Sequence, residues 1–200
     1  AALNAIDSKI AKERIDNLLE TVGLTEARNK KLKTFSGGML RRIGIAQALL
    51  NEPKILILDE PTAGLDPRER VRFRNIISAL GKNRIVILST HIVSDVEYIA
   101  DQIMIMKQGA FIKTGTQAQI LEPVAGCVWK CVVSEKEAEE LNATYAVSNL
   151  RGSEREGQVE LRVVSQKSPH QDAKAMEPVL EDAYLYYYLC ERNHHRGAWE

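Results

Sequence analysis

The sequence predicts an α/β protein that ends in a smaller α+β domain. Two aliphatic runs, Ile55–Leu58 and Ile85–Leu88, lack alternation between apolar and polar residues, which is typical of strands buried on both faces of a parallel sheet. Helical periodicity surrounds both runs, and a strand–helix–strand–helix order predicts a sheet with crossover helices. Beyond Pro123 the pattern changes to short alternating strands. We therefore expect two domains, residues 1–122 and residues 123–200.

Composition narrows the classes of protein that fit. The chain has 200 residues, of which 44% are hydrophobic and 27% are charged, as in a folded soluble protein. Its 27 Lys and Arg residues balance 27 Asp and Glu residues, which argues against a nucleic-acid partner because such binding needs surplus cationic side chains. No apolar run approaches the roughly 20 residues that span a bilayer. Three cysteines are too few for a disulfide scaffold and fit a reducing compartment.

The first domain is expected to contain helices with clear start and stop signals. One helix covers residues 8–22 and stops at Gly23, and a second begins at Ser36. A third has Asp66 as its N-cap, with Glu69 as the reciprocal partner of a capping box. The remaining elements expected here are a helix over residues 92–100 and a hairpin formed by residues 103–106 and 110–113.

The second domain is expected to be a small α+β domain with short alternating strands and two helices. Its strands are predicted over residues 127–133, 145–150 and 159–164. Ser134 followed by Glu137 predicts a capped helix between the first two strands. The last helix starts near Pro178 and carries four tyrosines. Because consecutive residues go around a helix, we expect these tyrosines to pack in a core or contact a partner rather than line a ligand site.

Phosphate chemistry is indicated first by Ser36, Gly37 and Gly38. Two glycines let the backbone approach a ligand, and a helix N-terminus offers free N–H groups and a partial positive charge. The alternative interpretation of the same residues is a glycine-rich turn with a serine cap.

Metal and water chemistry is indicated by Asp59 and Glu60, which follow an aliphatic strand directly. Ligands of open α/β sheets bind at the carboxyl ends of the strands, and Mg²⁺ prefers one or two carboxylates with phosphates and waters. Glu60 is placed to orient an attacking water. His91 follows the neighbouring strand, where it would donate to a phosphate oxygen, although a lone histidine is often structural.

Taken in order, four segments resemble the second half of an ABC-transporter ATPase cassette. They are Phe35–Met39, Ile55–Pro61, Gly64–Asp66 and Ser89–His91. The resemblance implies a partial P-loop-NTPase-type ABC cassette, with a helical signature subdomain in residues 1–51 and a catalytic sheet segment in residues 52–122, followed by the small α+β domain.

The resemblance also implies the roles of the site residues. Ser36, Gly37 and Gly38 match the signature motif, which contacts the γ-phosphate held by the opposite protomer, and Asp66 matches the D-loop at the dimer interface. The carboxylate of Asp59 matches the Walker B residue that supports Mg²⁺, through water. Glu60 matches the catalytic glutamate that acts on the hydrolytic water, and His91 matches the switch histidine that senses the γ-phosphate.

The cofactors and partners follow from the same resemblance. It implies ATP and Mg²⁺, a transmembrane permease, a second ATPase protomer in a head-to-tail dimer, and a place on the cytoplasmic face of the membrane. Phe35 and Met39 replace the commoner Leu and Gln of the signature. Ser36–Met39 followed by Arg41 and Arg42, together with the closing segment Leu180–Leu185, is similar to the drug- and antibiotic-exporting branch of the family.

One motif of the family is missing from the sequence. The sequence contains no Gly-x-x-x-x-Gly-Lys-Ser/Thr loop. Its only Gly-Lys pair is Gly81-Lys82, and Ile76 stands where the first glycine of such a loop would be. That loop cradles the α- and β-phosphates of a nucleotide. We therefore expect this chain to be a truncated part of a longer subunit and to be inactive as an ATPase alone.

Two other interpretations stay open at this point. An ABC ATPase that works on ribosomes or DNA would be expected to carry heptads or surplus positive charge, which the tail lacks. A non-enzymatic binding module would use the tail, where zinc is the ligand to consider. The side chains that it would need are Cys127, Cys131, Cys190, His194 and His195, which also fit buried thiols and a solvated histidine tail.

Overall fold

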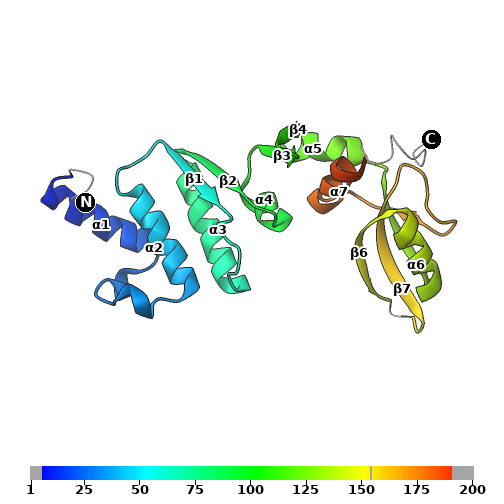
Figure 1. Ribbon diagram of the computed structural model, residues 1–200, viewed down its shortest axis with the longest axis horizontal. Helices are drawn as coiled ribbons and strands as arrows, with labels where there is room; N and C mark the ends of the chain where they lie inside the picture. Colours follow the sequence, from blue (N-terminus) through cyan, green and yellow to red (C-terminus); the bar gives the residue numbers. More distant parts are fainter. Residues whose placement is uncertain (1–5, 154, 191–200) are drawn as a thin grey trace. The chain divides into compact units, whose positions relative to one another are not determined.

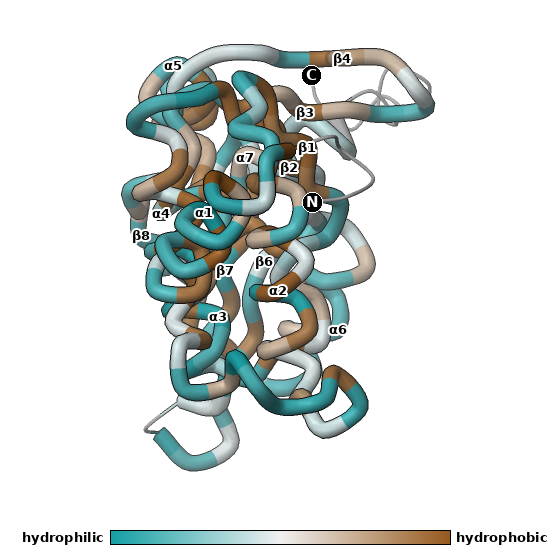
Figure 2. The backbone as a smooth tube through the Cα atoms, turned by 90° about the vertical axis from the view of Figure 1, so that its left-hand side faces the viewer, coloured by the Kyte–Doolittle hydropathy of each residue, from teal (hydrophilic) through white to brown (hydrophobic). Residues whose placement is uncertain are grey.

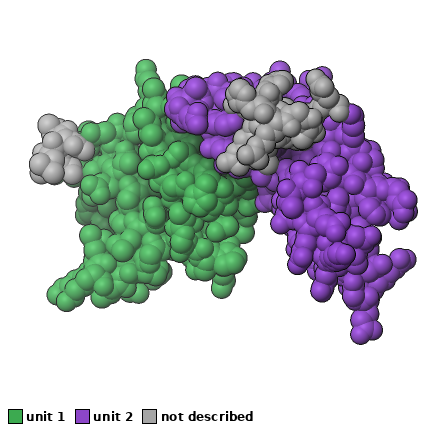
Figure 3. Space-filling view, turned by 45° about the vertical axis from the view of Figure 1, so that its right-hand side comes forward, with its two compact units in different colours: residues 1–99 green, residues 100–200 purple. Residues whose placement is uncertain are grey.

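The structure is a computed structural model that describes residues 6–153 and 155–190. The chain divides into two compact units, residues 1–99 and residues 100–200, which Figure 3 shows in different colours. The domain boundary predicted at residue 123 lies inside the second unit. Each unit is described by itself.

Unit 1 has the predicted order of helices and strands (Figure 1). Its elements are α1 (Ser8–Thr21), η2 (Thr25–Ala27), η3 (Leu32–Thr34), α2 (Gly37–Leu49), β1 (Ile55–Asp59), α3 (Pro67–Gly81), β2 (Ile85–Ser89) and α4 (Val93–Ile99). After α1, Gly23 adopts a φ of 62°, a left-handed conformation that suits glycine and ends the helix where the sequence predicts. The α/β class and the crossover helix between the two strands are confirmed.

Strands β1 and β2 pair in parallel, with α3 as the crossover between them. The register runs from Ile55 opposite Ile85 to Asp59 opposite Ser89. Both strands are hydrophobic along most of their length (Figure 2). This register brings the two carboxyl ends to one edge of the sheet.

The prediction that both strands are buried on both faces is wrong for the described chain. Ile55, Ile57, Ile85 and Ile87 are 53%, 73%, 60% and 43% exposed. Leu56 on the other face is buried, in a core that includes Phe73 of α3. Side chains alternate between the two faces of a strand, so covering one face leaves every second aliphatic side chain in solvent.

The core of unit 1 forms where α1, α2 and α3 meet the covered face of the sheet. The buried residues of α3 are Phe73, Ile76, Ile77 and Leu80. They pack with Leu49 of α2 and Leu19 of α1 in one hydrophobic cluster. The shared core holds the start of α2 at Gly37 and the start of α3 at Pro67 in the same compact unit as the carboxyl ends of β1 and β2.

Unit 2 contains a hairpin, an antiparallel sheet and four helical segments. Its elements are β3 (Ile103–Lys107), β4 (Ala110–Gly115), α5 (Gln117–Leu121), η4 (Glu122–Val124), β5 (Val128–Ser134), α6 (Glu135–Thr144), β6 (Ala146–Gly152), β7 (Gln158–Val164), β8 (Lys174–Ala175) and α7 (Leu180–Cys190). The sheet order is β6-β7-β5-β8. The predicted small α+β fold and the Ser134–Glu137 capping box are confirmed.

Helix α7 contacts both the hairpin region and the sheet of unit 2. The Tyr187 hydroxyl donates to the carbonyl oxygen of Ile120 in α5 at 3.1 Å. The Lys107 ammonium donates to the carbonyl oxygen of Tyr188 at 3.0 Å. The tyrosines of α7 therefore pack against the region before residue 123, which explains why the hairpin and the tail form one compact unit.

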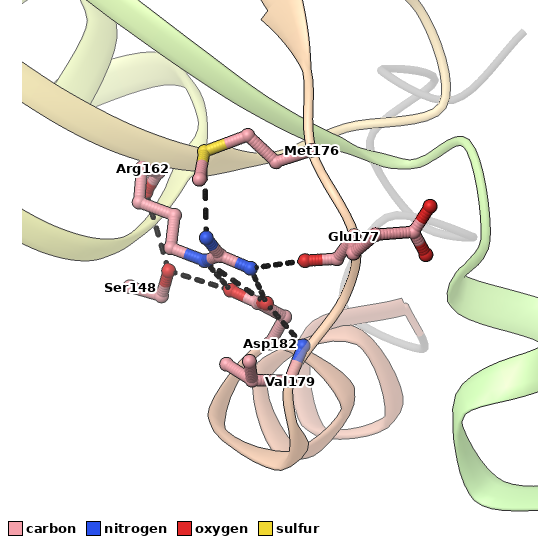
Figure 4. Close-up of polar contacts among 6 residues, drawn as sticks. All are labelled: Ser148, Arg162, Met176, Glu177, Val179 and Asp182. Carbon is pink, nitrogen blue, oxygen red and sulfur yellow. Dashed lines mark hydrogen bonds and ion pairs between the residues drawn. The ribbon is translucent and has the colours of Figure 1, made fainter. Parts of the chain in front are cut away.

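A buried ion pair joins β7 to the first turn of α7 (Figure 4). The Arg162 Nε donates to Asp182 Oδ1 at 2.9 Å, and its Nη2 donates to Oδ2 at 2.7 Å. The backbone N–H of Val179 and the hydroxyl of Ser148 also donate to Asp182. Hydrogen bonding to Asp182 raises the pKa of Arg162 against the effect of burial. The carboxylate of Asp182 is thus satisfied from three segments of the chain.

Replacing this carboxylate by an amide should destabilise unit 2. Asp182→Asn removes the charge that pairs with Arg162 in a fully buried position, and we expect a loss of about 3 kcal/mol in the free energy of unfolding. Urea unfolding followed by the fluorescence of Trp129, in a Trp199→Phe background, measures this change. Asp172→Asn at an exposed position is the control and should leave the midpoint unchanged. Equal midpoints for both variants would contradict the structural role of the pair.

Candidate functional site

Asp59 ends β1 opposite Ser89 at the end of β2. The Ser89 hydroxyl donates to Asp59 Oδ1, and the backbone N–H of Glu60 donates to the Ser89 carbonyl oxygen at 2.9 Å. The pairing of the two strands therefore extends one residue beyond the sheet. Asp59 is exposed and presents its second carboxylate oxygen at the sheet edge where the sequence predicts a ligand.

Glu60 and His91, predicted from separate strands, contact each other. The His91 Nδ1 lies 2.9 Å from Glu60 Oε1, and the backbone N–H of His91 donates to the same oxygen at 3.1 Å. A carboxylate only accepts hydrogen bonds, so Nδ1 carries the proton in this contact, and Nε2 is then an acceptor unless the ring is charged. The imidazole is largely exposed and open to a ligand.

Glu60 adopts a backbone conformation that is uncommon for a side-chain-bearing residue. Its φ is 44°, in the left-handed region. This conformation turns the chain sharply at the strand end. Two contacts hold Glu60 in this conformation. Its backbone N–H donates to the carbonyl oxygen of Ser89, and its carboxylate accepts hydrogen bonds from His91. Strained residues of this kind concentrate at functional sites.

The residues at this edge fit a magnesium ion supported mainly by substrate and water. The described residues contain no group of three or more His, Cys, Asp or Glu side chains arranged to hold a metal. Magnesium does not need such a cage, because it keeps several waters and binds one or two carboxylates together with phosphate oxygens. Asp59 supplies one such carboxylate.

Ser36 and Gly37 form the start of α2. Ser36 is the N-cap, and its hydroxyl oxygen accepts from the backbone N–H of Met39 at 3.3 Å. A side chain at Gly37 would meet nothing within 4 Å, so the backbone there is open to a ligand. Gly38 is buried and faces Glu69 of α3. The predicted serine cap is therefore confirmed, and it leaves the hydroxyl hydrogen free to donate.

Asp66 is the N-cap of α3, but the predicted capping box with Glu69 is wrong. The Asp66 Oδ1 accepts from the backbone N–H of Glu69 at 3.0 Å. The reciprocal bond is missing because the Glu69 carboxylate pairs with Arg42 of α2 at 3.2 Å. A buried cation from a distant segment competes successfully for the carboxylate with a backbone N–H that solvent also satisfies.

A groove of about 530 Å³ separates α2 from β1. Gly37 of α2 and Asp59 of β1 both line it. Its other lining residues are Leu40, Arg41, Gly44, Ile45, Ala48, Ile57, Leu58, Pro61 and Phe73. The structure thus joins Asp59, Glu60 and His91 at the strand ends. It places Ser36 and Asp66 at two separate helix starts.

Sequence reasoning missed the pair that anchors the loop after Glu60. The Thr62 hydroxyl donates to Asp95 Oδ2, and both residues are 1% exposed. Arg74 of α3 lies 3.5 Å from the other Asp95 oxygen. This group ties the loop between β1 and α3 to α4. The only hint in the sequence was that Asp95 is an acidic residue in the first turn of a predicted helix. Acidic residues are common at that position because they favour the helix start, so the hint did not indicate a contact with Thr62.

The residues proposed for zinc give no metal site among the described side chains. Cys131 is fully buried in the core of unit 2, where burial raises the pKa of its thiol. Cys127 is partly buried. The side chain of Cys190 and the residues His194 and His195 lie outside the described part of the chain.

Comparison with known proteins places the motifs in a family. Residues 3–63 match the ABC transporter family. The crystal structure of the ADP conformation of MJ1267, an ATP-binding cassette of an ABC transporter, aligns with a TM-score of 0.51 at 27% identity, over 56% of this chain and 44% of that one. The chain therefore carries part of an ABC transporter ATP-binding cassette, as the motifs predict.

Curated relatives give the same assignment. The uncharacterised ABC transporter ATP-binding protein YxlF of Bacillus subtilis is 40% identical over 134 residues, which are 67% of this chain and 45% of the relative. The linearmycin resistance ATP-binding protein LnrL of Bacillus subtilis is 42% identical over 117 residues, 58% of this chain and 38% of LnrL.

The daunorubicin resistance ATP-binding protein DrrA3 of Streptomyces coeruleorubidus is 34% identical over 151 residues, 75% of this chain and 47% of DrrA3. The chain is thus similar to two ATP-binding proteins that are named for drug resistance. The chain spans about half the length or less of these relatives. None of the helices that the structure describes is long and apolar enough to cross a membrane.

The loop anchor should matter for the stability of unit 1. Thr62→Val keeps the shape of the side chain but removes the hydroxyl that donates to buried Asp95, and we expect a loss of about 2 kcal/mol in the free energy of unfolding. Urea unfolding followed by circular dichroism measures this change. Thr25→Val, at an exposed position of the same unit, is the control. A Thr62→Val variant as stable as the control would show that Asp95 does not depend on this donor.

Proposed function

We propose that this chain is part of the ATP-hydrolysing subunit of an ABC exporter. The observation that carries the proposal is the contact of Glu60 with His91 beside Asp59, at the carboxyl ends of two parallel strands. Phosphoryl transfer to water needs a positioned carboxylate, a cation near the phosphates and a donor to the phosphate oxygens. These three residues supply the first and third groups and a ligand for the second.

Each side chain has a defined part in the proposed reaction. The Glu60 carboxylate orients the attacking water toward the γ-phosphate of ATP and accepts its proton. His91, held by Glu60 through Nδ1, directs Nε2 to a γ-phosphate oxygen and donates to it when protonated. Asp59 would hold Mg²⁺, through water, and the ion would neutralise charge on the phosphates.

The two helix starts contribute from the opposite protomer of a head-to-tail dimer. Ser36, Gly37 and Gly38 are proposed to contact the γ-phosphate bound to the partner, where the N-terminus of α2 favours an anion. Asp66 is proposed to lie at the same dimer interface. The dimer would sit on the cytoplasmic face of the membrane, on a transmembrane permease, and would energise export. LnrL and DrrA3, both named for drug resistance, support that direction of transport.

The 200-residue chain alone is proposed to lack hydrolysis. It contains no P-loop sequence, so no backbone cradle holds the α- and β-phosphates. The exposed isoleucines of β1 and β2 support this proposal, because an aliphatic sheet face is expected to be covered by further strands or helices.

Isothermal titration of the 200-residue chain with ATP and Mg²⁺ tests this point. We expect no binding at micromolar concentrations and no phosphate release. The same measurements follow on a completed cassette, defined as this chain joined behind the part of YxlF that precedes its matched residues. There we expect ATP binding and turnover. Micromolar binding by the 200-residue chain would contradict the proposal.

The role of Glu60 is tested in the completed cassette. Glu60→Gln keeps the size of the side chain and removes its ability to accept a proton, so we expect turnover to fall by about 100-fold or more while ATP binding persists. Phosphate release and nucleotide binding are measured side by side. Glu13→Gln, at an exposed position of α1, should retain full turnover. Unchanged turnover in Glu60→Gln would exclude this residue as the base.

A further inference from the structure

The two glycines of the proposed signature motif have different surroundings. A Cβ atom at Gly37 would meet nothing within 4 Å. A Cβ atom at Gly38 would lie 2.6 Å from Glu69 Oε2, closer than such atoms approach, and 3.1 Å from Glu69 Cδ, so the Glu69 side chain would have to move. Gly37 is therefore open to a ligand. The space beside Gly38 is already filled by a side chain of α3.

Arg42 holds Glu69 in that space. Its Nη2 lies 3.2 Å from Glu69 Oε2, an oxygen that is buried and has no hydrogen-bond partner among the described residues. The Arg42 residue is only 4% exposed. Without Arg42, the Glu69 carboxylate would be left as a partly buried charge with no cation on Oε2.

The rest of the Arg42 guanidinium binds backbone carbonyls. Its Nε donates to Gly38 O at 3.3 Å, and its Nη1 donates to Val22 O at 3.0 Å and to Gly23 O at 3.2 Å. Burial lowers the pKa of Arg42, and nearby Arg72 lowers it further, whereas Glu69 raises it. The planar guanidinium of arginine can donate to these carbonyls and to Glu69 at the same time, which the ammonium of a lysine at position 42 could not do.

The ion pair joins the starts of two helices. Arg42 lies one turn after Gly38 on α2, so it is tied to the turn that begins with Ser36. Glu69 lies in the first turn of α3, where its backbone N–H donates to Asp66. The start of α2 carries the residues proposed to contact the nucleotide of the opposite protomer, and Asp66 at the start of α3 is proposed to lie at the same dimer interface. The spacing of the two helix starts must be fixed if the dimer is to place the start of α2 on that nucleotide.

We infer that Arg42 and Glu69 are positioning residues of the ATPase, which hold the start of α2 at a fixed place relative to the start of α3. Position 38 is a glycine because Glu69 occupies the space of a side chain there, whereas the corresponding space at position 37 is open. The inference rests on the proposed function for its effect on turnover. The packing of the three residues is independent of that function.

The packing is tested in the 200-residue chain by thermal unfolding. Gly38→Ala should lower the Tm by about 5 °C or more, because the new methyl group displaces Glu69. Gly37→Ala, the matched control, should leave the Tm unchanged or raise it, since alanine favours a helix. In a Glu69→Ala background, Gly38→Ala should lower the Tm by less than half as much. Equal shifts in the two backgrounds would overturn the inference.

The positioning role is tested in the completed cassette. Glu69→Gln keeps the shape but loses the charge that holds Arg42, and we expect kcat to fall about tenfold with the KM for ATP within about twofold. Arg42→Lys should behave in the same way. Glu97→Gln, at an exposed position of α4, is the control. A lowered Tm with unchanged kcat would show that the pair only stabilises the fold and would overturn its positioning role.

The two failures are distinguishable. A completed cassette of unaltered sequence that shows no turnover counts against the proposed function. The glycine substitutions in the 200-residue chain decide the packing of Gly38, Arg42 and Glu69 regardless of that outcome.

Discussion

The parallel pairing of β1 with β2 is the constraint on which the candidate site depends. Because Asp59 lies opposite Ser89, the residues that follow each strand leave the sheet at the same edge. Glu60 and His91 are 31 positions apart in the chain, and they contact each other as a direct result of this register. A slip of one residue in the pairing would shift the end of one strand relative to the other and displace Glu60 from His91. The arrangement of side chains at this edge therefore depends on the pairing of the two strands.

The left-handed conformation of Glu60 adds a second constraint, because a strained residue of this kind costs about 1–3 kcal/mol. The surrounding bonds offset that cost. Its backbone is held by Ser89, its carboxylate accepts from His91, and the loop that follows is anchored by Thr62 on Asp95. Strain held from three sides keeps the carboxylate in one orientation, which general-base catalysis requires.

The features that depend on local sequence signals or on the order of motifs could be predicted from the sequence. Caps at Ser36 and Asp66, the stop at Gly23 and the two strands lie where they were predicted. Contacts between distant segments were not predictable. An aliphatic run such as Ile85–Leu88 indicates a strand, but it does not reveal whether both faces are covered. Capping rules likewise describe neighbours within one turn, so they assigned Glu69 to its own helix and missed its distant partner.

That partner, Arg42, belongs to a pattern that recurs in both units. Three first-turn carboxylates, Glu69 in α3, Asp95 in α4 and Asp182 in α7, pair with arginines of other elements. The positive end of the helix dipole favours a carboxylate in a first turn, which reduces the cost of burying it. The arginine then fixes that helix start to the rest of the unit. The acidic residues are visible in the sequence because they follow helix start signals. Which arginine pairs with each of them cannot be read from the sequence, because the pairing depends on how the elements pack.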